Sequence, residues 1–124
     1  MQGLIFIGLG GAVGALCRYG LGTLVGRLVG GTFPLGTMLV NLLGCLCIGF
    51  LAGVQEARQI LSPEWALFVF VGFLGSFTTF STFGLDAFKL LREEAILSTG
   101  LYVGGQVIVG VLAVFAGFAL SRLL

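Results

Sequence analysis

The chain has 124 residues, of which 58% are hydrophobic and 9% are charged, and its formal net charge is +1. Soluble domains carry about 25% charged residues, so this composition and a mean hydropathy of +1.17 exclude an ordinary soluble domain and predict an integral membrane protein. The balanced charge offers no basic patch for nucleic acid, and the absence of histidine removes the most common general base, so we expect no enzyme activity.

Four uncharged stretches alternate with short charged segments, which predicts an all-α fold of four transmembrane helices in one membrane domain, residues 1–124. A helix needs about 20 apolar residues to cross a bilayer. The approximate spans are residues 3–26, 35–56, 64–90 and 97–122. Pro34 and Pro63 fall in the first two connections, where a missing amide hydrogen does little harm.

The first span carries an arginine and closely spaced glycines. Arg18 lies too deep for comfortable contact with either membrane surface. An intramembrane arginine usually has a functional or a paired role, and a structural ion pair and a functional group both remain open here. Small residues spaced four apart let helix backbones approach closely in lipid, which predicts tight packing. Such pairs are Gly10/Gly14, Gly22/Gly26, Gly26/Gly30, Gly49/Gly53 and Gly100/Gly104.

The second span places Thr37, Asn41 and Cys45 on one helix face, because they are four residues apart. The Asn41 amide can donate into an ion path or can link helices by hydrogen bonds, which is the more common use of such a residue. The three cysteines show no metal-ligand spacing, so we expect them to fill space inside the spans.

Residues 72–83 of the third span combine aromatic rings with hydroxyls and glycines. A helix could unwind at Gly72 and Gly75, and unwound backbone inside a membrane is a recurring cation site. The edges of phenyl rings are electropositive, so rings, hydroxyls and an amide form a weakly positive path that suits a small hydrated anion. We expect one aromatic stripe along this helix, formed by Phe73, Phe77, Phe80 and Phe83. The interleaved hydroxyls belong to Thr78, Thr79, Ser81 and Thr82.

The charged residues favour neither orientation in the membrane. With Arg18 set aside, lysine and arginine number two on the side of both termini and three on the other. They are Arg58 and Arg122 on the first side, and Arg27, Lys89 and Arg92 on the second. Orientation follows a bias in such counts, so either one loop decides it or the chain inserts both ways and pairs head to tail in a twofold dimer. Asp86, near the end of the third span, is interpreted as an interfacial charge in contact with water.

Three segments resemble the CrcB/Fluc family of fluoride channels, and the resemblance covers essentially the whole chain. The segments are Gly10-Gly11-x-x-Gly14-x-x-x-Arg18-Tyr19, Gly36-Thr37-x-x-Val40-Asn41-x-x-Gly44 and the run from Gly72 to Phe83. The resemblance implies four-span subunits with a broken third helix that form antiparallel, dual-topology homodimers in the plasma membrane. It further implies a fluoride-selective channel that exports cytoplasmic fluoride passively and so protects against fluoride toxicity.

The resemblance also implies roles for individual residues. The expected pore residues are Phe80, Phe83, Asn41, Thr37, Ser81 and Thr82, with Tyr102 and Gln106 in the fourth span. Arg18 is expected near a pore vestibule, and the backbone carbonyls of Gly75 and Thr78 from both subunits are expected to hold one structural sodium ion. The chain departs from the family at Ser76, where many members have glycine, and beyond Gln106, where the family often has further hydroxyls.

Two other functions remain open at this stage. A small dual-topology proton-coupled exporter also has four spans, but it needs a carboxylate embedded in the membrane, and Asp86 lies near a span end. A structural membrane subunit without transport activity would account for the glycine-rich packing. It would leave the cluster of threonines and phenylalanines at 72–83 without a purpose.

Overall fold

The structure is a computed structural model that describes all of residues 1–124, and every regular element in it is helical. The elements are α1 (Gln2–Val29), α2 (Leu35–Arg58), α3 (Pro63–Ala66), the π-helix η1 (Leu67–Leu74), α4 (Gly75–Phe77), α5 (Phe80–Arg92) and α6 (Ile96–Ser121). Elements α3, η1 and α4 follow one another without interruption, and together with α5 they form a broken third span, Pro63–Arg92. Four segments are long and apolar enough to cross a membrane, which confirms the predicted four-span, all-α fold.

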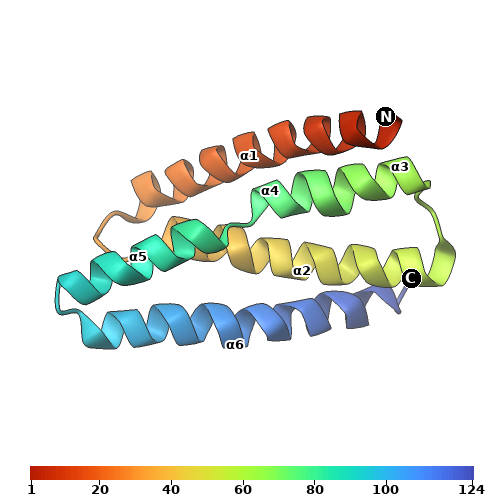
Figure 1. The fold of residues 1–124 in the computed structure, drawn as a ribbon. Coiled ribbons are helices and arrows are strands. Elements are labelled where there is room, and N and C mark those ends of the chain that lie inside the picture. The colour runs from red at the N-terminus through yellow and green to blue at the C-terminus, as the bar shows by residue number, and fades with distance from the viewer.

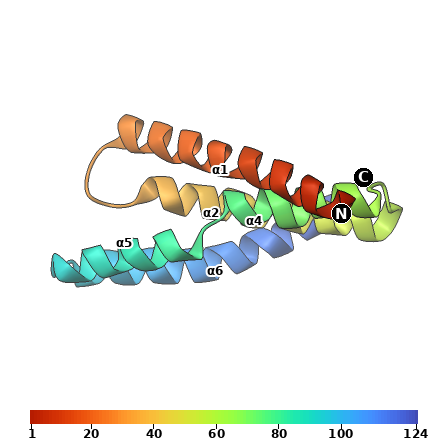
Figure 2. The same ribbon diagram turned by 45° about the horizontal axis from the view of Figure 1, so that its top comes forward.

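The helices run up and down along one long axis (Figure 1). Both termini and the α2–α3 connection lie at one end of the molecule, and the α1–α2 and α5–α6 connections lie at the other. The third span changes neighbours along its length: η1 and α4 pack on α1, whereas α5 packs on α6. Figure 2 shows the chain crossing between these two positions after α4. The break in the third span therefore lies where the chain passes from one side of the bundle to the other.

Glycines bring the helix backbones together at two interfaces. A side chain at Gly10 or Gly14 of α1 would overlap the backbone carbonyls of Phe68 and Phe73 in the third span. At the α2–α6 interface, a side chain at Gly49 or Gly117 would likewise overlap a backbone carbonyl, of Val114 or Leu46, and one at Gly53 would overlap the Ser121 side chain. The prediction of tight packing is confirmed for Gly10/Gly14 and Gly49/Gly53. A side chain would meet nothing within 4 Å at Gly26, Gly100 and Gly104, so these glycines face away from the rest of the chain.

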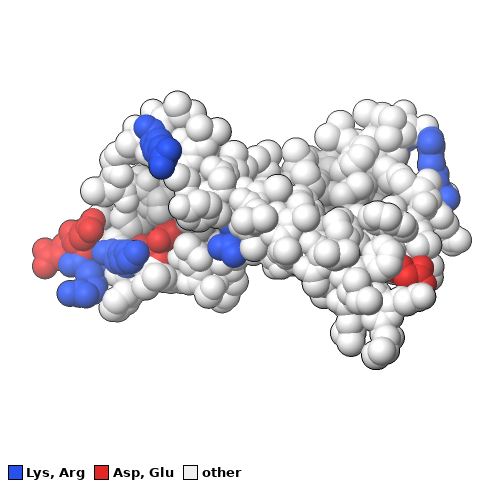
Figure 3. Space-filling view, turned by 90° about the horizontal axis from the view of Figure 1, so that it is seen from above, with Lys and Arg blue, Asp and Glu red and all other residues white.

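The surface of the single chain is largely apolar between its two ends. Only 16 of the 124 residues are buried, so most large hydrophobic side chains face outward and need lipid or another protein chain as a neighbour. Most of the charged atoms visible in Figure 3 gather at the two ends of the molecule and leave a mainly uncharged middle. This distribution is the one expected of a protein whose middle lies in a bilayer.

Candidate ion path at the helix break

The third span breaks at two consecutive threonines. Thr78 (φ −82°, ψ 158°) and Thr79 (φ −150°, ψ 119°) are extended and separate α4 from α5. The Thr78 amide and hydroxyl both donate to the Leu74 carbonyl, at 3.1 and 2.9 Å, and so close the end of α4. The Thr79 hydroxyl accepts a hydrogen bond from the Thr82 amide at 3.3 Å and caps the start of α5. Threonine side chains therefore stabilise both helix ends at the break.

The expectation that the helix unwinds at Gly72 and Gly75 is wrong in position. Gly72 lies inside η1, and Gly75 is helical, with φ −63° and ψ −30°. A side chain at Gly72 would lie 2.7 Å from the carbonyl oxygen of Ile7, so this glycine serves close packing against α1. Thr78 does lie at the break, as predicted, and Gly75 lies one turn before it.

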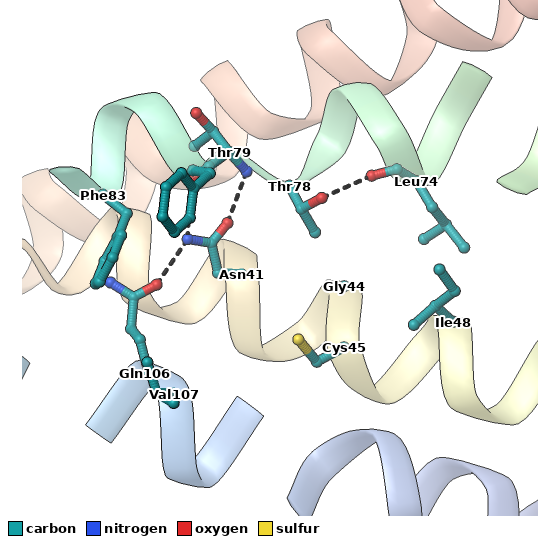
Figure 4. A pocket seen from close by; sticks show the side chains of 11 residues that line it. Asn41, Gly44, Cys45, Ile48, Leu74, Thr78, Thr79, Phe83, Gln106 and Val107 are labelled. Atoms are coloured by element: carbon teal, nitrogen blue, oxygen red, sulfur yellow. Dashed lines mark hydrogen bonds between the residues drawn. The ribbon is translucent and has the colours of Figure 1, made fainter. Parts of the chain in front are cut away.

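Asn41 joins α2 to the break. Its Oδ1 accepts a hydrogen bond from the Thr79 amide at 2.8 Å, and its Nδ2 donates to the Thr79 carbonyl at 3.1 Å. The same Nδ2 donates to Oε1 of Gln106 on α6 at 2.6 Å (Figure 4). The side-chain amide thus pairs with an extended peptide unit much as a neighbouring strand would. Of the two roles considered for Asn41, the structure shows the link between helices.

Gly44 lets the break approach α2. It lies three residues, about one turn, after Asn41, and a side chain there would overlap the methyl group of Thr78. Rotating the Thr78 side chain out of the way would remove its hydroxyl from the Leu74 carbonyl. A residue without a side chain is therefore required at this point of contact.

The break divides the aromatic residues into two groups, so the prediction of a single stripe is wrong. Phe73 and Phe77 stack on each other before the break, with centroids 5.7 Å apart and planes within 8°. Phe80 and Phe83 form a second pair after it, 5.4 Å apart and tilted by 41°. Phe83 also stacks on Tyr102 of α6 at 5.6 Å. Phe80 is 84% exposed, so its ring projects away from its own chain.

An open cavity of about 320 Å³ lies beside the break. It collects the predicted residues Asn41, Thr78, Phe80, Phe83 and Gln106 from α2, the third span and α6. Ser81 is exposed on α5, and its only polar neighbour is the Thr79 hydroxyl at 3.4 Å. Thr82 lies at the start of α5, where its hydroxyl accepts a hydrogen bond from the Thr79 hydroxyl at 3.0 Å. The other two predicted pore residues, Thr37 and Tyr102, lie in a second polar group.

The second polar group surrounds Asp86. Its Oδ2 accepts hydrogen bonds from the Thr37 hydroxyl at 2.8 Å and from the Tyr102 hydroxyl at 3.2 Å. Tyr102 is fully buried, and Asp86 also lines a cavity of about 290 Å³ below the α1–α2 connection. Asp86 is thus more than an interfacial charge, because it joins α2, α5 and α6. Thr37, Asp86 and Tyr102 lie on three different helices, so no local pattern in the sequence predicts that they meet.

Arg18 contacts the break from α1. Its Nε donates to the Ser76 carbonyl at 2.9 Å, so the arginine pairs with a backbone acceptor at the end of α4 and not with a carboxylate. It also lines a cavity of about 290 Å³ together with Thr37, Thr79 and Thr82. Of the two roles considered for Arg18, the structural ion pair is absent.

Comparison with known proteins places these features in a family. Residues 5–118 match the family model described as CrcB-like protein, Camphor Resistance (CrcB). The chain is 46% identical over 123 residues, 99% of each chain, to a Nitratidesulfovibrio vulgaris protein named fluoride-specific ion channel FluC. A protein of the same name from Stutzerimonas stutzeri is 46% identical over 117 residues, 94% of each chain. Another, from Maridesulfovibrio salexigens, is 40% identical over 124 residues, 100% of this chain and 98% of the other. The chain therefore belongs to the CrcB family of fluoride channels, as the resemblance predicted.

Proposed function

We propose that this protein is a fluoride channel of the plasma membrane that lets fluoride leave the cytoplasm down its electrochemical gradient. It is a multi-pass membrane protein and not an enzyme. The observation that carries the proposal is the break at Thr78–Thr79, which lies inside an apolar span and is held by Asn41 beside the exposed ring of Phe80. Irregular backbone at membrane depth is tolerated where it is buried in protein or lines a path for ions or water.

Fluoride export by this route needs no pump. Hydrogen fluoride is a weak acid that crosses membranes as a neutral molecule and ionises in a less acidic cytoplasm. A membrane potential that is negative inside then favours exit of the anion by about 2.3 kcal/mol per charge per 100 mV. A narrow path with fixed donors suits fluoride better than chloride, because the smaller ion accepts shorter and stronger hydrogen bonds.

The working unit is proposed to be an antiparallel dimer. The cavity at the break is open to one side, Phe80 projects from the chain, and the glycines at 26, 100 and 104 have no neighbour within their own chain. A second copy in the opposite orientation would cover these features and close the cavity into a path. The lining of each path is then formed by Phe80, Phe83, Asn41, Thr37, Ser81, Thr82, Tyr102 and Gln106, with Arg18 at a vestibule.

A structural sodium ion is proposed on the axis of this dimer. The Thr78 carbonyl lies in the extended break and accepts no hydrogen bond, and the Gly75 carbonyl lies one turn before it, whereas the carbonyls of Leu74 and Ser76 are occupied by Thr78 and Arg18. Two carbonyls from each of two copies would give four oxygen ligands, the ligand type that hard cations prefer. The residues present therefore fit the ion.

Fluoride efflux tests the proposal directly. Liposomes that contain the purified protein and are loaded with fluoride should release it when a potassium ionophore sets the membrane potential, as read by a fluoride electrode. Chloride-loaded liposomes are the matched control and should retain their anion. Absence of fluoride release contradicts the channel, and release that requires a proton gradient favours an exporter.

Separate measurements address the dimer and the sodium ion. Reporters fused to the C-terminus should be active on both sides of the membrane, and activity on one side alone contradicts dual topology. The purified dimer should dissociate at a higher temperature in sodium chloride than in N-methylglucamine chloride, because the larger cation cannot enter a carbonyl site. Equal dissociation temperatures contradict the sodium site.

A further inference from the structure

The connection between α1 and α2, residues 30–34, is held less firmly than the other two connections of the chain. It is the wide loop at the end of the molecule opposite the termini (Figure 2). In the α2–α3 connection, the Gln55 side chain both donates to the Leu61 carbonyl and accepts from the Leu61 amide. In the short α5–α6 connection, the amides of Glu94 and Ala95 bond back to the last turn of α5. Hydrogen bonds therefore fix both of these connections.

No hydrogen bond joins residues 30–34 to anything except the helix ends that they connect. Backbone hydrogen bonds reach only the last turn of α1, from Gly30, and the first turn of α2, from Phe33 and Pro34. Gly30 and Gly31 have φ of 67° and 84°. Glycine enters and leaves this left-handed region at little cost, because it has no Cβ atom. The two glycines can therefore act as a hinge for the residues that follow them.

The ring of Phe33 supplies the contact that the backbone of this connection lacks. It meets the ring of Tyr102 on α6 edge to face, with centroids 5.7 Å apart and planes at 88°. Tyr102 is fully buried and Phe33 is half-buried, so Phe33 helps to cover Tyr102 from the side of the connection. An aromatic pair is about as strong as one hydrogen bond. A contact of this strength can hold the connection down and still release it.

The connection covers the cavity of about 290 Å³ that Asp86 lines. The other walls are the last turns of α1 and the first turn of α2, and Asp86 is the only charged residue among them. Its Oδ2 is engaged by Thr37 and Tyr102, whereas its Oδ1 accepts no hydrogen bond and is not fully buried. One edge of the carboxylate is thus free in the space below the connection.

We propose that residues 30–33 form a hinged lid over Asp86. The two glycines are its hinge, and Phe33 latches it onto Tyr102 in the closed position that the structure shows. The lid controls how readily water and ions reach the carboxylate from this end of the molecule. The effect of the lid on transport rests on the proposed fluoride channel, because Tyr102 is proposed to line the path. The lid itself does not depend on that function.

Chemical labelling of carboxylates measures how often the lid opens. A water-soluble carbodiimide and an amine nucleophile modify each carboxylate that they reach, and mass spectrometry of peptides gives the rate at each position. Phe33→Ala should raise the labelling rate of Asp86 by about two- to tenfold, the factor that corresponds to the loss of one aromatic pair. The rates of Glu93 and Glu94, which are exposed on the α5–α6 connection, should not change. An unchanged rate at Asp86 overturns the proposal.

A variant of the hinge separates an opening lid from a hole left by a missing ring. Gly31→Ala keeps the ring but disfavours the φ of 84° in the closed position, so it should also raise the labelling rate of Asp86. If only Phe33→Ala raises this rate, the ring merely fills space, and the lid is overturned. Ile60→Ala is the matched control, because Ile60 is exposed on the connection that Gln55 holds, and it should leave the rate unchanged.

Fluoride efflux from liposomes connects the lid to transport. Phe33→Ala should raise efflux, by at most the factor found for labelling, because the path is reached more often when the latch is missing. Efflux that does not rise although Asp86 is labelled faster would mean that the lid does not control the path, and this part of the proposal would fail. Wild-type liposomes that release no fluoride would contradict the proposed channel, while the labelling rates would still decide whether the lid exists.

Discussion

The two halves of the third span, Pro63–Phe77 and Phe80–Arg92, pack on their neighbouring helices in different ways. The first half packs on α1 over buried glycines, and its backbone comes into direct contact with that helix. The second half packs on α6, and Asp86 bonds there to Tyr102. Close backbone packing holds helices firmly in lipid, whereas polar groups at membrane depth are costly and usually serve ions or protons. One half thus packs closely on its neighbour, and the other, under the proposed function, presents donors and rings to an ion.

A substitution at Gly44, which separates the second half of the span from α2, is expected to lower fluoride efflux the most. Gly44→Val places a side chain on the Thr78 methyl group and forces the break away from α2. Loss of the two hydrogen bonds between Asn41 and Thr79 should lower fluoride efflux by about thirtyfold, at about 1 kcal/mol each. Liposome efflux measures the effect. Gly8→Val, where a side chain meets nothing within 4 Å, is the control, and an equal loss there would contradict a local cause.

The ring pair after the break should give the next largest effect. Phe80→Ile and Phe83→Ile each remove an electropositive ring edge from the cavity while keeping an apolar side chain. We expect fluoride efflux to fall by about tenfold, the equivalent of about 1.4 kcal/mol, with the dimer intact on size exclusion. Phe88→Ile is the control, because that ring is exposed elsewhere on α5. Undiminished efflux in both ring variants would remove the rings from the mechanism.

Asp86, in the second half of the span, can act as a hydrogen-bond acceptor or as a negative charge, and two substitutions separate these roles. Asp86→Asn keeps an acceptor for Thr37 and Tyr102, so efflux should stay within about threefold of wild type. Asp86→Ala leaves both hydroxyls without their acceptor, and efflux should fall by about tenfold, the loss expected for hydrogen bonds to a charged group. Parallel efflux assays at one ionic strength compare the two variants. If Asp86→Asn is as damaging as Asp86→Ala, the negative charge matters more than the geometry.

The difference between the two halves of the third span also explains which features could be predicted from the sequence. The four spans follow from charge-free stretches, and two of the five glycine pairs, Gly10/Gly14 and Gly49/Gly53, do lie at helix contacts, because both signals are local in the chain. The expectation drawn from the glycines misplaced the break at Gly72 and Gly75, because a glycine looks like the natural place for a helix to unwind, whereas the resemblance indicated Thr78 correctly. In the structure Gly72 is used for packing, and two threonines hold the extended backbone through hydrogen bonds to Leu74 and Asn41. The group around Asp86 was also missed, since only the fold brings residues from three helices together.

The smallest effect on transport, and the clearest contrast between the halves, is expected from one glycine in each. A side chain at Gly72 would lie 2.7 Å from the Ile7 carbonyl oxygen, whereas one at Gly84 of α5 would meet nothing within 4 Å. Gly72→Ala should therefore destabilise the protein by about 1–3 kcal/mol through overpacking. Gly84→Ala should stabilise α5 by up to about 1 kcal/mol through helix propensity. Thermal unfolding in detergent compares them, and efflux from the folded protein should change little in either. A larger loss of stability at Gly84 than at Gly72 would mean that the second half of the span is as tightly packed as the first, and the contrast between the two halves would fail.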